Sequence, residues 1–105
     1  MHPASQRSVG IRCDYQPDVD LLFAWVGDPQ PAENIEVEPG IYVRVASSTG
    51  QVIGIEVLDC AERFGHEPDR IDAAFAKALL ARFTAPALQR FREAHPQPPL
   101  FSSPR

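Results

Sequence analysis

The sequence has no long apolar run. In its 105 residues, no unbroken apolar segment approaches the length of ~20 residues that a membrane-spanning helix needs. The first residues, MHPASQRSVGI, also lack the apolar centre of a secretion signal. We therefore expect a cytoplasmic protein that does not bind membranes.

Cysteine is scarce, and motifs for metals and phosphates are missing. Cys13 and Cys60 are the two cysteines, and without a secretion signal we expect both to be free thiols. The three histidines are scattered, and neither an H-E-x-x-H motif nor a C-x-x-C pair occurs. No glycine-rich phosphate loop is present. The sequence thus predicts no metal and no cofactor.

Positive charge is also limited. Ten lysines and arginines face fourteen acids, for a net charge of −4. Residues 1–65 hold ten acids and four bases, a balance of −6, whereas residues 66–105 have a balance of +2. Phosphate binding needs a clustered basic surface, so an acidic body argues against nucleic acid as the main ligand. A basic protein partner suits it better.

What the sequence does contain is a series of short segments with strand patterns. Ile11, Cys13 and Tyr15 alternate with polar residues, the period of a half-buried strand. The segment 19–26 is apolar at both parities, which favours a central strand covered on both faces. We also expect Phe23, Trp25 and Tyr42 to pack in the core rather than to stack nucleic-acid bases. The predicted strands are 10–15, 19–26, 34–38, 41–46 and 52–58.

The hairpin formed by the last two segments has a pattern that predicts its register. If Ser48-Thr49-Gly50 is a three-residue loop with Gly50 in the left-handed conformation, paired residue numbers add up to 98. Val45 then faces Ile53, Val43 faces Ile55 and Ile41 faces Val57. A slip by one residue would mix apolar and polar faces, so the pattern rejects it.

After Gly65 the apolar period changes to that of a helix. The spacing predicts an amphipathic helix over 69–83, begun by Pro68 at its first position or by Asp69 as its cap. Pro86 cannot continue a helix interior, so Thr84 is expected to cap a second short helix over 85–94. The apolar face serves the core or a homodimer, our preferred oligomer, and consists of Phe75, Leu79, Phe83, Leu88 and Phe91.

These elements predict an α+β fold. A small, mainly antiparallel sheet of four or five strands carries the C-terminal helix on one face, followed by the second short helix. We expect a flexible N-terminus over 1–9, a sheet domain over 10–65, a helical extension of the same domain over 66–94, and a proline-rich disordered tail over 95–105.

Three motifs resemble a bacterial family of unknown function. They are YQPDVDLLFAWV at 15–26, EVEPGIYV at 36–43 and GQVIGIEVLDCAERF at 50–64. Over roughly residues 11–64 the chain resembles the family known as domain of unknown function 2283. The resemblance implies a small antiparallel sheet domain without an established activity, and an antitoxin-like role opposite a small basic toxin. The helical extension lies outside it.

The charged run after the last strand allows two interpretations. Asp59 followed by Glu62 has the spacing of a reciprocal helix cap, and Gly65 suits the end of a single helical turn. In the alternative, Cys60 is a nucleophile at a helix N-terminus, assisted by His66. We favour the capped turn, because no signature of a cysteine hydrolase is present. Any catalytic role would fall to Cys60.

The sequence therefore favours an interaction domain over an enzyme. We expect it to bind a protein partner through the polar face of its sheet, without catalytic activity. The alternative is a small ligand-binding protein or enzyme that uses Cys60, Asp59, Glu56 and His66. An accessory nucleic-acid role for the basic helices is a third hypothesis. The candidate partner-binding residues are Tyr42, Arg44, Glu56, Glu36 and Glu38.

Overall fold

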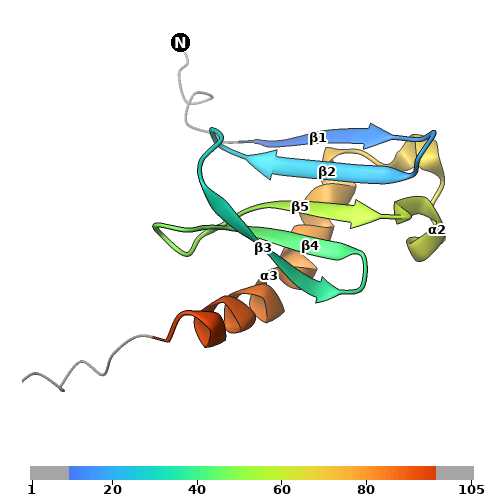
Figure 1. Ribbon diagram of the computed structural model, residues 1–105. Coiled ribbons are helices and arrows are strands. Elements are labelled where there is room, and N and C mark those ends of the chain that lie inside the picture. Colours follow the sequence, from blue (N-terminus) through green and yellow to red (C-terminus); the bar gives the residue numbers. More distant parts are fainter. Residues whose placement is uncertain (1–9, 97–105) are drawn as a thin grey trace, which may run out of the picture.

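The computed structural model describes residues 10–96 as one antiparallel sheet and one long helix (Figure 1). The predicted flexible segment 1–9 and residues 97–105 of the predicted tail 95–105 lie outside the described residues. Five strands are present, as the pattern predicts, and the α+β class is confirmed. The strands are β1 (Ile11–Gln16), β2 (Leu21–Val26), β3 (Ala32–Glu38), β4 (Ile41–Ala46) and β5 (Val52–Leu58).

The order of strands across the sheet is β1-β2-β5-β4-β3, and every neighbouring pair is antiparallel. The first strand pair therefore joins the hairpin of β4 and β5 through β2. We expected the second strand to begin at Val19, but Val19 lies in the turn before β2 and is 58% exposed. β1 and β3 are the outer strands, and each has one edge that pairs with no other strand of residues 10–96.

Within residues 10–96, only one face of the sheet is covered. In β2, Leu22 and Ala24 are fully buried, whereas Phe23 and Trp25 are half-buried. The expectation of cover on both faces is thus wrong, and so is that of core packing for the aromatic residues of β2. The core consists of the other face of each strand, packed on the single helix α3 (Ala73–Ala94) that crosses behind the sheet in Figure 1.

The predicted register of β4 and β5 is right for four pairs and then shifts. Ile41 faces Val57 and Val43 faces Ile55, but Val45 faces Val52 rather than Ile53. The loop has four residues, because the Ala46 amide bonds the Gln51 carbonyl at 2.8 Å. A bulge then absorbs the extra residue and restores the expected faces. Gly50 has the predicted left-handed backbone, with φ 74°.

The long helix begins later than the sequence predicts. Pro68–Arg70 forms a separate 3-10 turn, η1, and α3 begins only after Asp72. The Asp72 carboxylate accepts a bond from the Phe75 amide at 3.0 Å. Asp72, rather than Asp69, is therefore the N-terminal cap of the helix.

A single helix continues through Pro86, where we expected two. Pro86 lacks an N–H for the carbonyl four residues before it, which costs roughly 3 kcal/mol in a helix interior. Packing on both sides outweighs this cost, because Phe83 and Ala87 are both buried against the sheet. Thr84 does not cap; its hydroxyl donates to the Leu80 carbonyl at 2.6 Å. Figure 1 shows α3 changing direction along its length, as proline in a helix predicts.

Gly54, in the middle of β5, has no room for a side chain. A Cβ atom at this position would lie 2.8 Å from the Ala24 carbonyl oxygen of β2 and 3.4 Å from the Arg44 side chain. The backbone oxygen cannot move without disturbing the pairing of β2 with β5. We predict that Gly54→Ala lowers the free energy of unfolding by about 1–3 kcal/mol in urea denaturation.

Gly10→Ala is the matched control for this prediction. No atom lies within 4 Å of a Cβ at Gly10, so this variant should unfold like the wild type. Equal stability of the Gly54 variant and the wild type would contradict the close approach.

Candidate functional site

The uncovered face of the sheet carries two rows of side chains that run across all five strands. Strand pairing places Phe23 opposite Asp14 and Glu56, and Tyr42 opposite Glu56 and Glu36. Carboxylates and aromatic rings therefore alternate along this row, which we call the acidic row: Asp14, Phe23, Glu56, Tyr42 and Glu36.

The second row is adjacent and carries the positive charge of this face. Arg12 faces Trp25, Trp25 faces Gly54, and Gly54 faces Arg44. Because Gly54 has no side chain, the Arg44 stem lies over it. The Arg44 guanidinium donates to the Asn34 side-chain oxygen at 2.8 Å. The two rows join at Phe23 and Trp25, whose rings stack with centroids 5.2 Å apart.

The electrostatics of the acidic row are those of uncompensated carboxylates. The negative charge of Glu36 is the largest cause that raises the pKa of Tyr42, followed by desolvation, a hydrogen bond to Glu36 and the charge of Glu56. Within residues 10–96, the one salt bridge joins His95 to Glu33 at 2.8 Å. The three carboxylates of the acidic row thus have no cationic partner among the described residues.

A shallow pocket of about 250 Å³ lies beside these rows. Ile53, the extra residue of the β5 bulge, lines this pocket and does not belong to the main core cluster. Ile53 is buried, as expected, with 9% of its surface exposed, but the bulge places it beside this pocket instead of opposite Val45. The other lining residues are Phe23, Trp25, Val26, Asp28, Pro29, Gln30 and Arg44.

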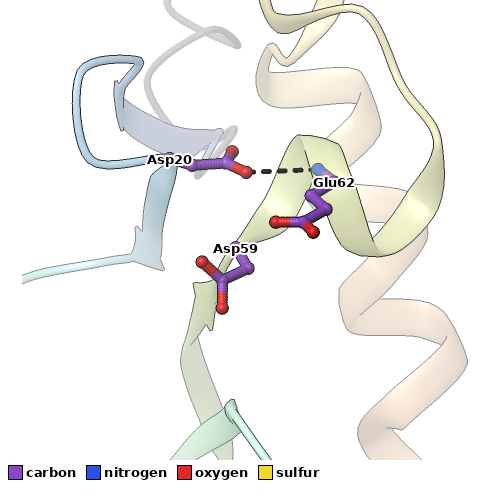
Figure 2. Close-up of side chains that lie close together, drawn as sticks. All are labelled: Asp20, Asp59 and Glu62. Carbon is purple, nitrogen blue, oxygen red and sulfur yellow. Dashed lines mark hydrogen bonds between the residues drawn. The ribbon is translucent and has the colours of Figure 1, made fainter.

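At the far end of β5, three carboxylates meet around the short helix α2 (Cys60–Phe64). Side-chain oxygens of Asp20, Asp59 and Glu62 lie within 4.8 Å of one another. Asp20 comes from the turn between β1 and β2, and Figure 2 shows it reaching the backbone nitrogen of Glu62. The side chain of Asp59 points away from the helix in the same view.

Asp20, rather than Asp59, caps α2. Its two oxygens accept bonds from the amides of Ala61 at 2.7 Å and Glu62 at 3.1 Å, and its backbone carbonyl accepts one from Cys60 at 3.0 Å. Asp59 makes no side-chain cap bond and has a left-handed backbone, with φ 54°. The predicted reciprocal cap is therefore wrong. Gly65 does end the helix in the left-handed conformation, as expected.

Sequence reasoning missed Asp20 because its partners are 41 and 42 residues away. Its local pattern offers one signal, a tyrosine five residues earlier. The Tyr15 hydroxyl donates to Asp20 Oδ1 at 2.6 Å. This bond to Asp20 is the largest cause that raises the pKa of Tyr15 to about 12, ahead of desolvation and the charges of Asp20 and Cys60.

Cys60 is inside the core. Its residue surface is 0% exposed, and burial, followed by the charges of Asp20 and Cys13, raises the pKa of its thiol to about 11. The structure does not bring the alternative set together. His66 stacks on Phe75 at 4.3 Å between ring centroids, and Glu56 lies on the uncovered face of the sheet.

The remaining sequence candidates divide between the core and the surface. Leu79 and Phe83 are each 4% exposed, while Phe75, Leu88 and Phe91 pack partly buried around the core. Glu38 lies on β3, opposite Ile41 and just after the strand's bulge. Both cysteines are free thiols, as expected.

We predict that titration of Asp20 contributes to acid unfolding. Burial acts to raise the pKa of Asp20, but the bonds from Tyr15, Ala61 and Glu62 outweigh it and lower the pKa below the usual 3.8. The stabilisation is thus complete above pH 3.8 and is lost as the pH falls through the folded-state pKa.

Urea unfolding of Asp20→Asn tests this. The variant should be less stable by about 1–2 kcal/mol at pH 7, because an NH2 group replaces one of the two oxygens that accept bonds from three donors. The difference from the wild type should shrink below about pH 4. Asp18→Asn, in the same turn, is the control. A difference that stays constant down to pH 2.5 would contradict the linkage.

A second prediction concerns thiol reactivity. At pH 8 the buried Cys60 should react with a colorimetric disulfide reagent only at the rate of unfolding, because both access and the thiolate fraction are low. The half-exposed Cys13 should react in the folded protein. The folded Cys13→Ser variant should therefore show almost no reaction with the reagent. A fast-reacting thiol in that variant would restore Cys60 as a nucleophile.

Comparison with known proteins gives one family match. The model of the family "Protein of unknown function (DUF2283)" matches residues 12–60, from β1 to the first residue of α2. No curated protein and no solved structure matches the chain. No helix in the described part of the chain is long and apolar enough to cross a membrane. The match supports the resemblance seen in the three sequence motifs. It covers the sheet and leaves α3 outside.

Proposed function

We propose that this protein is a non-enzymatic interaction domain that binds a basic protein partner on the uncovered face of its sheet. The observation that carries the proposal is the acidic row. Asp14, Glu56 and Glu36 alternate with two aromatic rings on a face that none of the described helices covers. The partner would meet this face in the cytoplasm.

The row matches the chemistry of an extended segment with alternating basic and apolar side chains. Each carboxylate can pair with a lysine or arginine, and Phe23 and Tyr42 offer apolar surface between them. Since the carboxylates have no cation among the described residues, a basic partner would not have to displace an internal ion pair. Complementary charge also speeds the encounter of the two proteins.

The pocket beside Trp25 supplies an anchor point. Its walls are largely apolar, from Trp25, Val26 and Ile53, and its volume of about 250 Å³ suits one large side chain. Interfaces gain most of their affinity where such a side chain fills a pocket near the centre. Charge along the row would then set orientation, and the pocket would limit dissociation.

The placement of the titratable groups supports binding over catalysis. A general acid or base must lie within reach of a reacting proton and its partner group. Here the Cys60 thiol is in the core, with its pKa raised to about 11, and Glu56 is on the opposite side of the sheet. An antitoxin-like role, in which the partner is a small basic toxin, fits both the acidic row and the family resemblance.

The protein encoded by the adjacent gene is the first partner to test. We predict a complex at micromolar concentration in low salt, detected by light scattering, with affinity that falls as salt rises. The double variant Glu36→Gln and Glu56→Gln should weaken binding by roughly tenfold or more, because it removes two charges from the acidic row.

Glu67→Gln with Glu93→Gln is the matched control. Both residues are exposed and lie before and within the helical region, so net charge changes equally while the sheet face stays intact. Absence of a complex at low salt would contradict the proposal. An equal loss of affinity in the control variant would also contradict it, because binding would then depend on net charge and not on the acidic row.

A further inference from the structure

The two edges of the sheet are protected to different degrees. At β3, the Arg90 guanidinium of α3 donates to the Glu36 carbonyl at 2.6 Å, so the helix occupies part of that edge. His95, just after α3, pairs with Glu33, and a bulge interrupts the strand between Glu36 and Glu38. Inserted charges and bulges are common ways to prevent edge-to-edge pairing.

Within residues 10–96, the β1 edge has no such protection. Its six residues, IRCDYQ, include no proline, glycine or bulge. Among the described residues, no side chain bonds the backbone of Ile11–Gln16, and only the Gln16 carbonyl accepts a bond outside strand pairing. A flat, regular strand with free backbone groups is a template for another strand.

The sequence of β1 is complementary to itself when reversed. In an antiparallel pair of two β1 strands centred on Cys13, residue numbers add up to 26. Arg12 then faces Asp14 of the second copy, and Asp14 faces Arg12 of that copy. Ile11 faces Tyr15 of the second copy, so the half-buried apolar side chains of each strand meet on the core side.

Neighbouring registers are excluded by charge and by face. A sum of 24 places Arg12 opposite Arg12, and a sum of 28 places Asp14 opposite Asp14, each a like-charge pair that destabilises the sheet. Odd sums place core-side residues opposite solvent-side residues, which a sheet with one covered face does not tolerate. The register centred on Cys13 satisfies both conditions and pairs more of β1 than the even registers beyond these two neighbours.

We propose that two copies of this chain dimerise through antiparallel pairing of their β1 strands, with Cys13 on the two-fold axis. The result is a continuous ten-stranded sheet with both α3 helices on one side. Both acidic rows lie on the other side. Asp14, at the end of each row, pairs with Arg12 of the second copy, whereas Glu56 and Glu36 remain available to a partner. This inference does not depend on the proposed partner, because it rests on the β1 edge alone.

The geometry also places the two Cys13 residues within reach of a disulfide. Directly opposed residues of an antiparallel pair have Cα atoms roughly 4.5–5.5 Å apart, inside the range of about 4.4–6.8 Å that a disulfide spans. Cys13 is half-exposed, whereas Cys60 is fully buried. A Cys13 cross-link is therefore a direct readout of the register.

The test uses the full chain and begins with its oligomeric state. A six-residue interface is small, so we expect a dimer that dissociates in the micromolar range by analytical ultracentrifugation. Asp14→Arg should weaken it roughly tenfold, because symmetry places like charges at two positions. The exchange R12D/D14R restores opposite charges and should recover most of the affinity. Circular dichroism checks that each variant folds.

Oxidation at pH 8.5 tests the register. Diamide accepts the two hydrogen atoms released when two thiols form one disulfide, so the wild type should give a covalent dimer and Cys13→Ser should give none. A protein that is monomeric at 200 µM, or a dimer that D14R does not weaken, would overturn the proposal. A dimer that R12D/D14R fails to recover, or that forms no Cys13 cross-link, would also overturn it.

Discussion

One helix has to cover a sheet of five strands, and this constraint decides which parts of the chain are core and which are surface. The buried face of each strand packs on α3, from Leu22 on β2 to Val43 on β4. No helix in the described part of the chain lies on the other face of the sheet, so the residues of that face stay accessible to the rest of residues 10–96 and to solvent. The same constraint keeps α3 intact through Pro86, since ending the helix there would expose the core around Ala87.

The Asp20 carboxylate has a different kind of influence, because it joins distant parts of the chain. It binds the turn after β1 to the first amides of α2, and it holds the Tyr15 hydroxyl at the same time. The end of β5 and the start of the helical region are thereby fixed relative to the first hairpin. Of the three carboxylates that meet here, Asp20 is the one that serves the backbone, which needs acceptors at a helix N-terminus.

Much of the fold could be predicted from the sequence because alternation in a strand is a local property. The five strands and the faces of β4 and β5 follow from period-two patterns around Val43 and Ile55. The bulge at Ile53 could not be predicted, because a four-residue loop with a bulge and a three-residue loop without one place the same side chains inward up to Val43. Nor could the cap of α2, where a residue distant in sequence replaced the local candidate Asp59.

The candidate site was only partly predictable for a related reason. Tyr42, Glu56 and Glu36 share a face because strand parity is readable, but strand order is not. That order brings Phe23 next to Glu56 and Arg12 next to Trp25. Pro86 shows the opposite failure: a strong local rule was overridden by packing on both sides of it.

The bulge of β5 limits which lengths of the β4–β5 loop are compatible with the pairing of the two strands. The four-residue loop and the extra residue Ile53 compensate each other, so that Val43 and Ile55 stay paired. Loss of the bulge could compensate for deletion of one loop residue. Insertion of one residue would need a second bulge, or it would move the apolar side chains of one strand to the opposite face of the sheet. Length variation here should thus be tolerated unequally in the two directions, and the deletion would withdraw Ile53 from the pocket beside Trp25.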